Sequence, residues 1–406
     1  MTRLIAYVGT YASGSGTQGG GVVGLEVSGD GQILRLLTRA PEPKNAGYLV
    51  YGSTTHTLYA VDERKTDGRG PVGRPAAVHA LSVDPMTGAL SWLNCSIAPG
   101  PMPTFLDYSA ARGLLISASH GDFHHVEKVI KRADGSWVIE YLYDDSTVVV
   151  YPLAADGRVG AASDVHVFSG QGKDPNGSPQ NGGHAQSSPH AHCAVIDPSG
   201  HYVLVCDKGT DRIEVFRLGL QLDHVSTLQF EEETAPRHLA FDPTTGLAFA
   251  TLELSSELAS LRFDPQAGTL SRLNVVSTVA PAYDGHNEPA EVRVHPAGNL
   301  IYVNNRGEDS LAWFRTDAEG NLERLGAVGL ARSVHPGLAA RSFAIDPSGT
   351  FMLVADRPAH LVRSYAVCRG PGALTSLAQV HVPDPACIAF VDLDEPRPDV
   401  ATRHSP

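Results

Sequence analysis

Four stretches in the second half of the chain repeat one order of apolar and polar positions. They begin at residues 192, 238, 291 and 342, and each predicts an apolar strand, a turn, a second apolar strand, a polar step and a third strand. The turns read Asp197-Pro-Ser-Gly, Asp242-Pro-Thr-Thr-Gly, His295-Pro-Ala-Gly and Asp346-Pro-Ser-Gly. Proline presets φ early in such a turn, and glycine takes the positive φ at its end. The turns recur at intervals of 45, 53 and 51 residues, the period of a four-stranded propeller blade.

Weaker copies of this pattern account for the rest of the chain. Residues 48–93 predict one blade and residues 103–159 predict another. Three strands within residues 5–38 lack a fourth partner, which residues 387–394 can supply. Pairing the last strand with the first would close the ring and remove the open sheet edge. The sequence therefore predicts an all-β, seven-bladed β-propeller of four-stranded antiparallel blades. Stacked sandwiches would not explain the single recurring turn.

No linker divides the chain, so we expect one domain over residues 1–394 and a tail at residues 395–406. Two insertions interrupt the blades. Residues 121–145 alternate around an Ala-Asp-Gly-Ser turn and predict an added hairpin. Residues 169–189 are rich in Gly, Ser, Asn and Pro and predict a flexible loop. Long loops on a rigid scaffold often cover sites, although either insertion can also be plain decoration.

Composition narrows the partners and the compartment. The 406 residues carry a net charge of −13 and no basic run, which argues against nucleic acid and anionic membrane surfaces. No apolar run reaches the ~18 residues of a membrane span. The first residues lack the apolar core and cleavage site of a signal peptide. The five cysteines are odd in number and lie mostly in strand-like runs, which favours free thiols and a cytoplasmic location.

The repeat also indicates a polar ring at one mouth of the channel. Five residues before each turn lie His192, Arg237, Ala290 and Arg341. Near the far end of each second strand we align Asp207, Glu253, Asn305 and Asp356, with Lys208, Arg306 and Arg357 directly behind. Unpaired ionisable groups are costly in a packed core, so matched positions of this kind favour a binding site for a small anion. The alternative for each residue alone is an inter-blade salt bridge, above all for Arg341, Asp356 and Arg357.

These motifs resemble a known family. The segments SPHAHCAVIDPSG, APRHLAFDP, AEVRVHPAGNLIYVNNRG and RSFAIDPSG, with AYVGTY near the start, are similar to the seven-bladed propeller lactonases. That family includes bacterial 6-phosphogluconolactonase and fungal carboxy-cis,cis-muconate cyclase. The resemblance implies catalytic roles for His192, Arg237, Glu253 and Arg306, which match the cyclase's His, two Arg and Glu. Residues 95–150 depart from the family, because PMPTF lacks the usual histidine and the hairpin is extra. This departure leaves the substrate open.

The resemblance implies hydrolysis of a sugar-acid lactone, with 6-phosphogluconolactone as the first substrate to test. Such a reaction needs an activated water and a stabiliser for the oxyanion. Arg237 or Arg306 can stabilise the oxyanion, and His192 or Glu253 can take the proton; the sequence does not assign the base. We expect His190, Asp207, His238 and Arg341 to bind the substrate. A merely structural role for His190 is an equal alternative.

Other chemistries have less support. The His190-x-His192 pair has no third ligand at a metal-site spacing, and neighbouring arginines would repel a cation. We therefore expect no metal and no cofactor. The chain has no Gly-x-Ser-x-Gly elbow for acyl transfer on serine. A carboxymuconate-lactonising enzyme and a non-catalytic binding propeller remain the alternatives, since the fold alone implies no chemistry. We also expect ring residues to border solvent, so that their replacement would affect catalysis more than folding.

Overall fold

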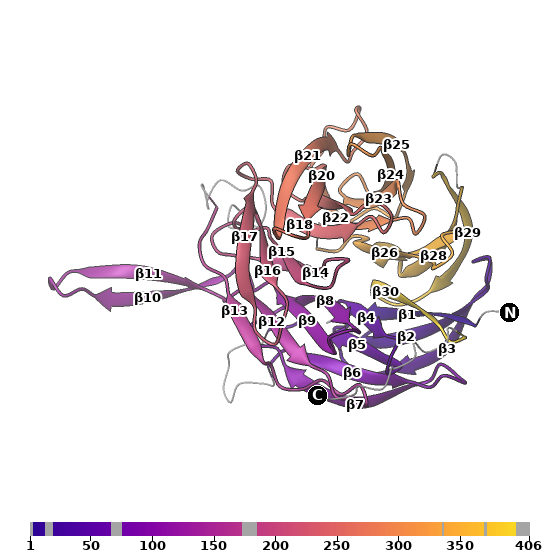
Figure 1. Cartoon of the computed structure of the whole chain (residues 1–406), viewed down its shortest axis with the longest axis horizontal. Coiled ribbons are helices and arrows are strands. Elements are labelled where there is room, and N and C mark those ends of the chain that lie inside the picture. The colour runs from indigo at the N-terminus through magenta and orange to yellow at the C-terminus, as the bar shows by residue number, and fades with distance from the viewer. Residues whose placement is uncertain are drawn as a thin grey trace.

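The computed structural model describes residues 3–12, 19–65, 75–172, 185–334, 337–368 and 372–394. Seven four-stranded antiparallel sheets surround a central axis, as Figure 1 shows. This arrangement confirms the predicted seven-bladed propeller. Within the described residues the single helix is the 3-10 turn η2 (Arg357–Ala359), and no helix has the length and apolar character needed to cross a membrane.

The blades follow one another along the chain, and we number them from the N-terminus. Blade 1 contains β30 (Pro385–Asp392), β1 (Leu4–Thr10), β2 (Gly21–Val27) and β3 (Leu34–Ala40). Blade 2 contains β4 (Leu49–Gly52), β5 (Thr57–Val61), β6 (Ala77–Val83) and β7 (Leu90–Ile97). Blade 3 contains β8 (Pro103–Ser109), β9 (Leu114–Ser119), β12 (Thr147–Pro152) and β13 (Asp164–Val167).

The four strongest repeats form the remaining blades. Blade 4 contains β14 (Ala191–Ile196), β15 (Tyr202–Asp207), β16 (Arg212–Arg217) and β17 (Asp223–Gln229). Blade 5 contains β18 (Pro236–Phe241), β19 (Leu247–Leu252), β20 (Glu257–Asp264) and β21 (Thr269–Ser277). Blade 6 contains β22 (Glu288–Val294), β23 (Leu300–Arg306), β24 (Ser310–Thr316) and β25 (Leu322–Gly329). Blade 7 contains β26 (Ser342–Ile345), β27 (Phe351–Asp356), β28 (Leu361–Val367) and β29 (Leu374–His381).

Burial explains the sequence pattern of the strands. The second strand of a blade is covered on both faces by the neighbouring blades, so β15, β19 and β27 are buried along their whole length and read as continuous apolar runs. The outermost strand lies at the circumference, and β17 contains only exposed and half-buried residues. The core therefore lies between blades, in layers around the axis.

The ring closes between the two ends of the chain. β30 pairs antiparallel with β1, from Leu4 opposite Asp392 to Thr10 opposite Pro385. The last strand thus supplies the innermost strand of blade 1, as predicted, and contacts the innermost strands β26 and β4 on either side.

The recurring turn connects the first and second strands of a blade. In blade 4 the Asp197 carboxylate accepts hydrogen bonds from the backbone N–H groups of Ser199, His201 and Tyr202 at 2.7–2.9 Å. Gly200 takes φ +71°, a conformation that favours glycine. Each innermost strand runs from one mouth of the channel to this turn, so its first residue lies at the opposite mouth.

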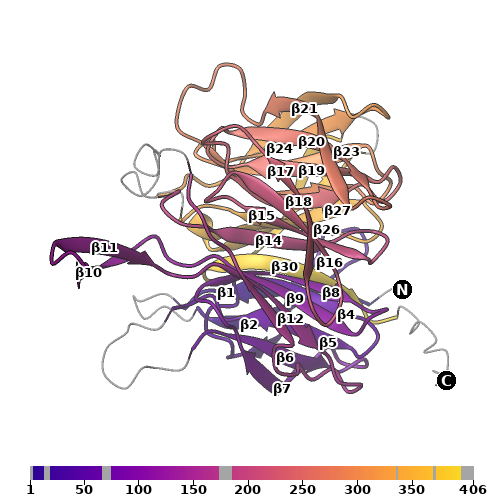
Figure 2. The same ribbon diagram turned by 60° about the vertical axis from the view of Figure 1, so that its left-hand side comes forward.

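The segment predicted as an added hairpin contains β10 (His125–Lys131) and β11 (Trp137–Tyr143), which form a separate two-stranded sheet. Figures 1 and 2 both show this hairpin projecting away from the ring. Most of the predicted flexible loop at residues 169–189, and the whole tail at residues 395–406, lie outside the described residues.

Candidate active site

Bulges at the start of the innermost strands bring side chains to one mouth of the channel. In blades 3, 4 and 5 the pairing with the second strand is interrupted at Thr104, at His192, and at Arg237 with His238. A β-bulge leaves its extra residue unpaired and re-aims the side chain. The bulges therefore explain how buried strands can present polar groups at the axis.

The end of the second strand provides another polar position in every blade. In blades 4 to 7 this position lies eleven residues after the first residue of the turn. Counted around the ring, its members are Tyr11, Glu63, His120, Lys208, Glu253, Arg306 and Arg357. Of the four residues that the sequence aligned at the end of the second strand, Glu253 holds this position, whereas Asp207, Asn305 and Asp356 lie one residue before it.

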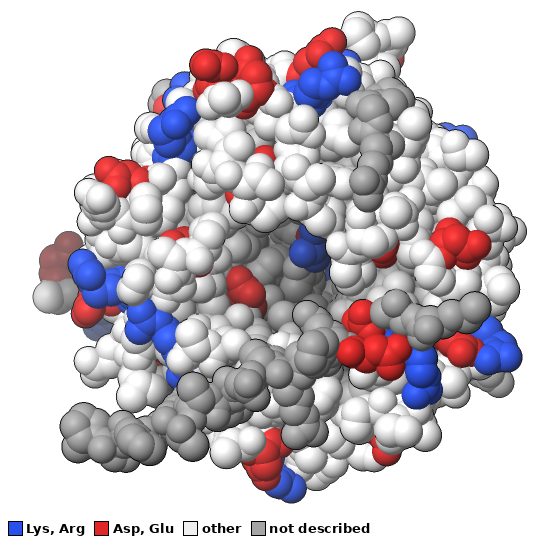
Figure 3. All heavy atoms as spheres, turned by 45° about the vertical axis from the view of Figure 1, so that its right-hand side comes forward, with Lys and Arg blue, Asp and Glu red and all other residues white. Residues whose placement is uncertain are grey.

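The two positions meet around a cavity of about 530 Å³. His192, Arg237, Glu253, Arg306 and Arg341 all line it. The face in Figure 3 is hollowed at the centre of the ring, and both basic and acidic side chains are visible inside the hollow. The sequence thus predicted five residues that the fold places around one cavity, although they come from four different blades.

Glu253 is the centre of the ionic network. Its Oε2 lies 2.7 Å from Arg237 Nε and 2.8 Å from Arg306 Nη2, and its Oε1 contacts Lys208 Nζ. The Glu253 side chain is only 1% exposed. Burial alone would raise its pKa, but Lys208, Arg306 and Arg237 outweigh burial and hold the pKa well below its usual range. Glu253 is therefore a permanent carboxylate that holds three cations in place.

A chain of two histidines and a carboxylate runs behind the cavity wall. His192 Nδ1 lies 3.2 Å from His238 Nε2, and His238 Nδ1 lies 3.4 Å from Glu291 Oε1. Burial first, and then the positive charge of Arg237, lower the pKa of His192 well below its usual value. Burial also lowers the pKa of His238 to about 4. Both imidazoles are consequently neutral at neutral pH.

Arg237 combines burial with unused hydrogen-bonding capacity. Its side chain is 3% exposed, and its Nη1 has no hydrogen-bond partner among the described residues. Burial lowers its pKa to about 10, so the guanidinium keeps its charge at neutral pH. A buried unpaired donor costs free energy, and a negatively charged oxygen in the cavity would satisfy it.

Arg341 lies on the other side of the cavity. Its Nη2 is 2.8 Å from Glu63 Oε2, which also accepts a 2.5 Å hydrogen bond from the Tyr11 hydroxyl. The guanidinium groups of Arg341 and Arg357 lie 4.8 and 4.3 Å from the Tyr11 ring centroid. Burial raises the pKa of Glu63, and Arg237 and Arg357 limit the rise.

With this geometry established, comparison with known proteins gives the family. The family model described as "Lactonase, 7-bladed beta-propeller" matches residues 5–390. The chain belongs to this lactonase family. It is similar to 6-phosphogluconolactonase of Bacillus subtilis, with 27% identity over 96% of this chain and 99% of the relative.

Solved structures show the same lactonase-family fold. The periplasmic gluconolactonase of Pseudomonas aeruginosa has 25% identity and a TM-score of 0.79, covering 96% of this chain and 99% of its own. A protein from Lactobacillus plantarum has 28% identity and a TM-score of 0.77, covering 97% of this chain and all of its own. The resemblance inferred from the motifs is confirmed.

Two predicted substrate-binding residues of this lactonase-family chain lie behind the cavity wall. Asp207 accepts hydrogen bonds from the backbone N–H groups of His190 and Gly209 at 2.7 and 3.0 Å, and from the Thr210 hydroxyl. The His190 ring stacks on His120 with centroids 4.5 Å apart. His238, a third predicted substrate-binding residue, contacts His192 on the side away from the main cavity, in a narrower part of the channel.

The predicted alignment of Glu253 with Asp207 is wrong by one residue. Asp207 pairs with Ala191, and the equivalent pair in blade 5 is Leu252 with Pro236. Glu253 therefore corresponds to Lys208. In both blades the second strand starts five residues after the first residue of the turn, Asp197 or Asp242. The extra residue in the Asp242 turn therefore does not shift the register of the second strand.

Six ionisable residues that line the cavity were not among the predicted site residues: Glu63, His120, Asp122, Lys208, His286 and Glu288. Lys208 lies eleven residues after Asp197, the first residue of its turn, and the same count from the turns of blades 2 and 3 gives Glu63 and His120. His120 takes a place on the wall of blade 3, where PMPTF lacks the family's histidine. Glu288, which lies 3.1 Å from Arg306, has no signal in the repeat.

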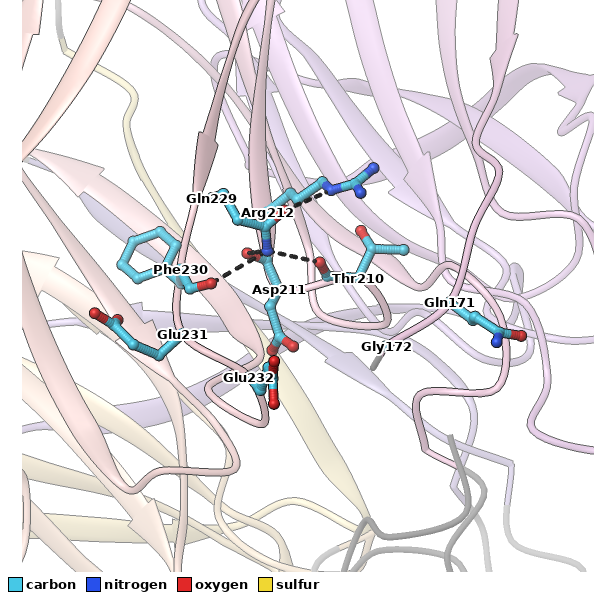
Figure 4. Close-up of a pocket in the computed structure, with 9 residues that line it drawn as sticks. All are labelled: Gln171, Gly172, Thr210, Asp211, Arg212, Gln229, Phe230, Glu231 and Glu232. Atoms are coloured by element: carbon cyan, nitrogen blue, oxygen red, sulfur yellow. Dashed lines mark hydrogen bonds between the residues drawn. The ribbon is translucent and has the colours of Figure 1, made fainter. Parts of the chain in front are cut away.

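A separate hollow of about 670 Å³ lies outside the ring, beside blade 4 (Figure 4). The Asp211 carboxylate in this hollow is already hydrogen-bonded within the protein, because its Oδ1 accepts hydrogen bonds from the backbone N–H groups of Thr234 and Ala235 at 3.0 and 2.8 Å. Among the described residues, no group of three or more His, Cys, Asp or Glu side chains is arranged to hold a metal ion.

Proposed function

We propose that this chain hydrolyses the internal ester of a sugar-acid lactone. One observation carries the proposal: Arg237, whose buried Nη1 has no hydrogen-bond partner among the described residues, lines the same cavity as the neutral imidazole of His192. The cavity thus offers a hydrogen-bond donor for an oxyanion beside a proton acceptor. The name of the Bacillus relative makes 6-phosphogluconolactone the first substrate to test, and the Pseudomonas neighbour makes glucono-1,5-lactone the second.

The histidine chain supports His192 as the base that the sequence left open. If His192 donates its Nδ1–H to His238 Nε2, then Nε2 of His192 carries the lone pair. No hydrogen bond within the described part of the chain involves that atom. His238 can in turn donate Nδ1–H toward Glu291, whose charge would stabilise the imidazolium that forms. Glu253 is a poor base, because three cations already occupy its oxygens.

The reaction then proceeds in two steps. The water oxygen attacks the lactone carbonyl carbon while its proton moves to His192 Nε2, and the carbonyl oxygen becomes an oxyanion beside Arg237. In the second step the bond from carbon to the ring oxygen breaks, and that oxygen takes the proton back from His192. The product is the open hydroxy acid. Preorganised positive charge and general-base help of this kind usually provide most of the acceleration.

The proposal is tested by proton release from both lactones, corrected for their hydrolysis in buffer. We expect turnover of at least one lactone and a loss of ~10²-fold or more in kcat/KM for His192→Ala. His201→Ala, an exposed histidine on the blade 4 turn, is the matched control and should retain parental activity. If no lactone is hydrolysed faster than in buffer, the enzyme assignment fails and a non-catalytic binding propeller replaces it.

We also propose the cytoplasm as the compartment. Cys193 and Cys206 are register partners in blade 4, both buried, and both are free thiols. Adjacent free thiols persist in a reducing environment. Acid quenching of cells, followed by denaturation, alkylation and mass spectrometry, should find both thiols reduced; an oxidised pair would favour the periplasm named for the Pseudomonas neighbour.

A further inference from the structure

The β10–β11 hairpin exposes large apolar side chains on both of its faces. Cross-strand partners share a face, and one face carries Val129 opposite Ile139 and Tyr141 opposite Glu127. Trp137 lies on the same face, opposite Lys131. Val129, Trp137, Ile139 and Tyr141 are 69, 65, 54 and 54% exposed. The other face carries Val126, Ile130 and Leu142, which are also exposed. We call the first face, with Val129, Trp137, Ile139 and Tyr141, the aromatic face of the arm.

The hairpin exposes far more large apolar side chains than a surface that only faces water usually does. The hairpin supplies seven of the seventeen exposed large hydrophobic residues in the described part of the chain. A lone two-stranded ribbon is marginally stable in water, and a contiguous exposed apolar patch usually marks an interaction surface. The base of the arm is held to the ring, because Lys65 Nζ lies 2.7 Å from Asp144 Oδ2. The arm is therefore fixed at its base, and none of the described segments covers it along its length.

The same chain exposes an apolar groove of about 870 Å³ on blades 1 and 2. Its apolar lining includes Leu81, Leu90, Trp92 and Ile97, with Cys95 among them. Trp92 and Ile97 are 59 and 61% exposed. Charged residues of both signs, among them Arg39 and Glu42, also line the groove, which gives the apolar centre and polar rim typical of protein interfaces.

We propose that the aromatic face of the arm docks into the blade 1–2 groove of a second copy of this chain. The arm points away from its own ring in both views, so a groove on another molecule is the natural receptor (Figures 1 and 2). Because each copy carries both an arm and a groove, two copies related by a two-fold axis can each place their arm in the groove of the other.

The area of such a dimer is sufficient. The seven-residue strands make an arm of roughly 24 Å, and each copy contributes both an arm and a groove. Two aromatic anchors and several aliphatic side chains on each side can approach the ~800 Å² per partner that specific interfaces bury. A lipid surface fits less well, since the chain carries a net charge of −13.

Light scattering coupled to gel filtration tests the dimer on the full-length protein. We expect a dimer for the parent chain at micromolar concentration. Ile139→Lys on the aromatic face and Trp92→Lys in the groove should each raise the dimer Kd at least 100-fold. Ile130→Lys, the same substitution on the opposite face of the arm, should leave the dimer intact. Thermal melting should be unchanged in all three, since these residues lie outside the blade cores.

Cross-linking identifies the contact itself. Ile139→Cys should form an intermolecular disulfide with the native Cys95 of the second copy under mild oxidation, and Ile130→Cys should not. Adding Cys95→Ser to Ile139→Cys should abolish the cross-link. A parent chain that is monomeric at 100 µM overturns the proposal, and so does a dimer that survives both Ile139→Lys and Trp92→Lys. A monomer that binds neutral lipid vesicles through the arm would assign the surface to a membrane instead.

Discussion

At the scale of single residues, burial makes the side chains of the polar ring part of the protein's stability as well as of the candidate site. Sequence reasoning places them at the border with solvent, but Glu253 and Arg237 are 1 and 3% exposed. A buried ion pair contributes little relative to apolar packing, whereas removal of one partner leaves the other charge unpaired at a cost of ~3–5 kcal/mol. The network around Glu253 therefore links the site to the stability of blades 4, 5 and 6.

Glu253→Gln should consequently lose both stability and activity. The amide keeps the shape but leaves Lys208, Arg237 and Arg306 with one negative charge fewer among them. We expect a drop in melting temperature and a loss of ~10²-fold or more in lactone kcat/KM, about 2.7 kcal/mol of transition-state stabilisation. Glu231→Gln is the control, because it breaks an exposed pair with Arg272. A Glu253→Gln variant that melts and turns over like the parent would contradict the network.

The pH profile tests the state of His192. Its pKa is lowered well below the ordinary 6.5, so the neutral base persists as the pH falls. We expect kcat/KM for uncharged glucono-1,5-lactone to stay level from pH 7 to pH 6 and to fall only at more acidic pH, where His192 becomes protonated. An inflection near pH 6.5 would show instead that the base has an ordinary histidine pKa.

At the scale of elements, the recurring turn sets the start of each second strand and so the position of the ring residues. Its glycine occupies the left-handed region in every strong repeat, at φ between +71° and +75°. The turns also meet between blades, because the His295 ring lies 2.9 Å from the Gly349 carbonyl oxygen.

Two glycine substitutions separate backbone strain from this contact. A Cβ on Gly200 would meet nothing within 4 Å, whereas one on Gly349 would lie 2.5 Å from His295 Nε2 at the same φ of +71°. Gly200→Ala should lower the free energy of unfolding by ~1–2 kcal/mol, the cost of placing alanine in the left-handed conformation. Gly349→Ala should cost more, because the imidazole must move. Denaturant unfolding of both variants measures the difference, and equal losses would contradict an ordered contact between the turns.

At the scale of the whole molecule, closure of the ring makes seven blades one unit. β30 provides the innermost strand of blade 1 and carries part of its apolar core, including Ile388. Without this strand, β1 would become an open edge and blades 1, 2 and 7 would lose packing.

Truncation tests the closure. Deletion of every residue after Asp384 should lower the melting temperature sharply or cause aggregation. Deletion after Asp394 removes only the tail and should leave the melting temperature unchanged. The two chains differ by β30 and the two residues that follow it, so equal thermal stability would show that the ring does not depend on this strand.

The sequence alone determined the blade count, the closing strand and several of the residues that line the cavity. Each blade repeats a local pattern of strand, turn and strand, and local spacing is directly visible in the chain. His192, Arg237 and Arg341 are found by counting back from a turn, because each innermost strand starts at the same mouth. The register of the second strand was predicted less well. The sequence aligned Glu253 with Asp207, whereas the strand register aligns it with Lys208.

The tertiary structure decided which of these groups act together. Glu253 contacts Lys208 of blade 4 and Arg306 of blade 6. These partners are about 50 residues away in sequence and become neighbours only because blades pack side by side around the axis. Burial, which neutralises His192 and keeps Glu253 charged, is likewise a property of the assembled ring. Local periodicity specifies where each side chain leaves its strand, but ion pairing and desolvation depend on what the adjacent blades bring to the same point.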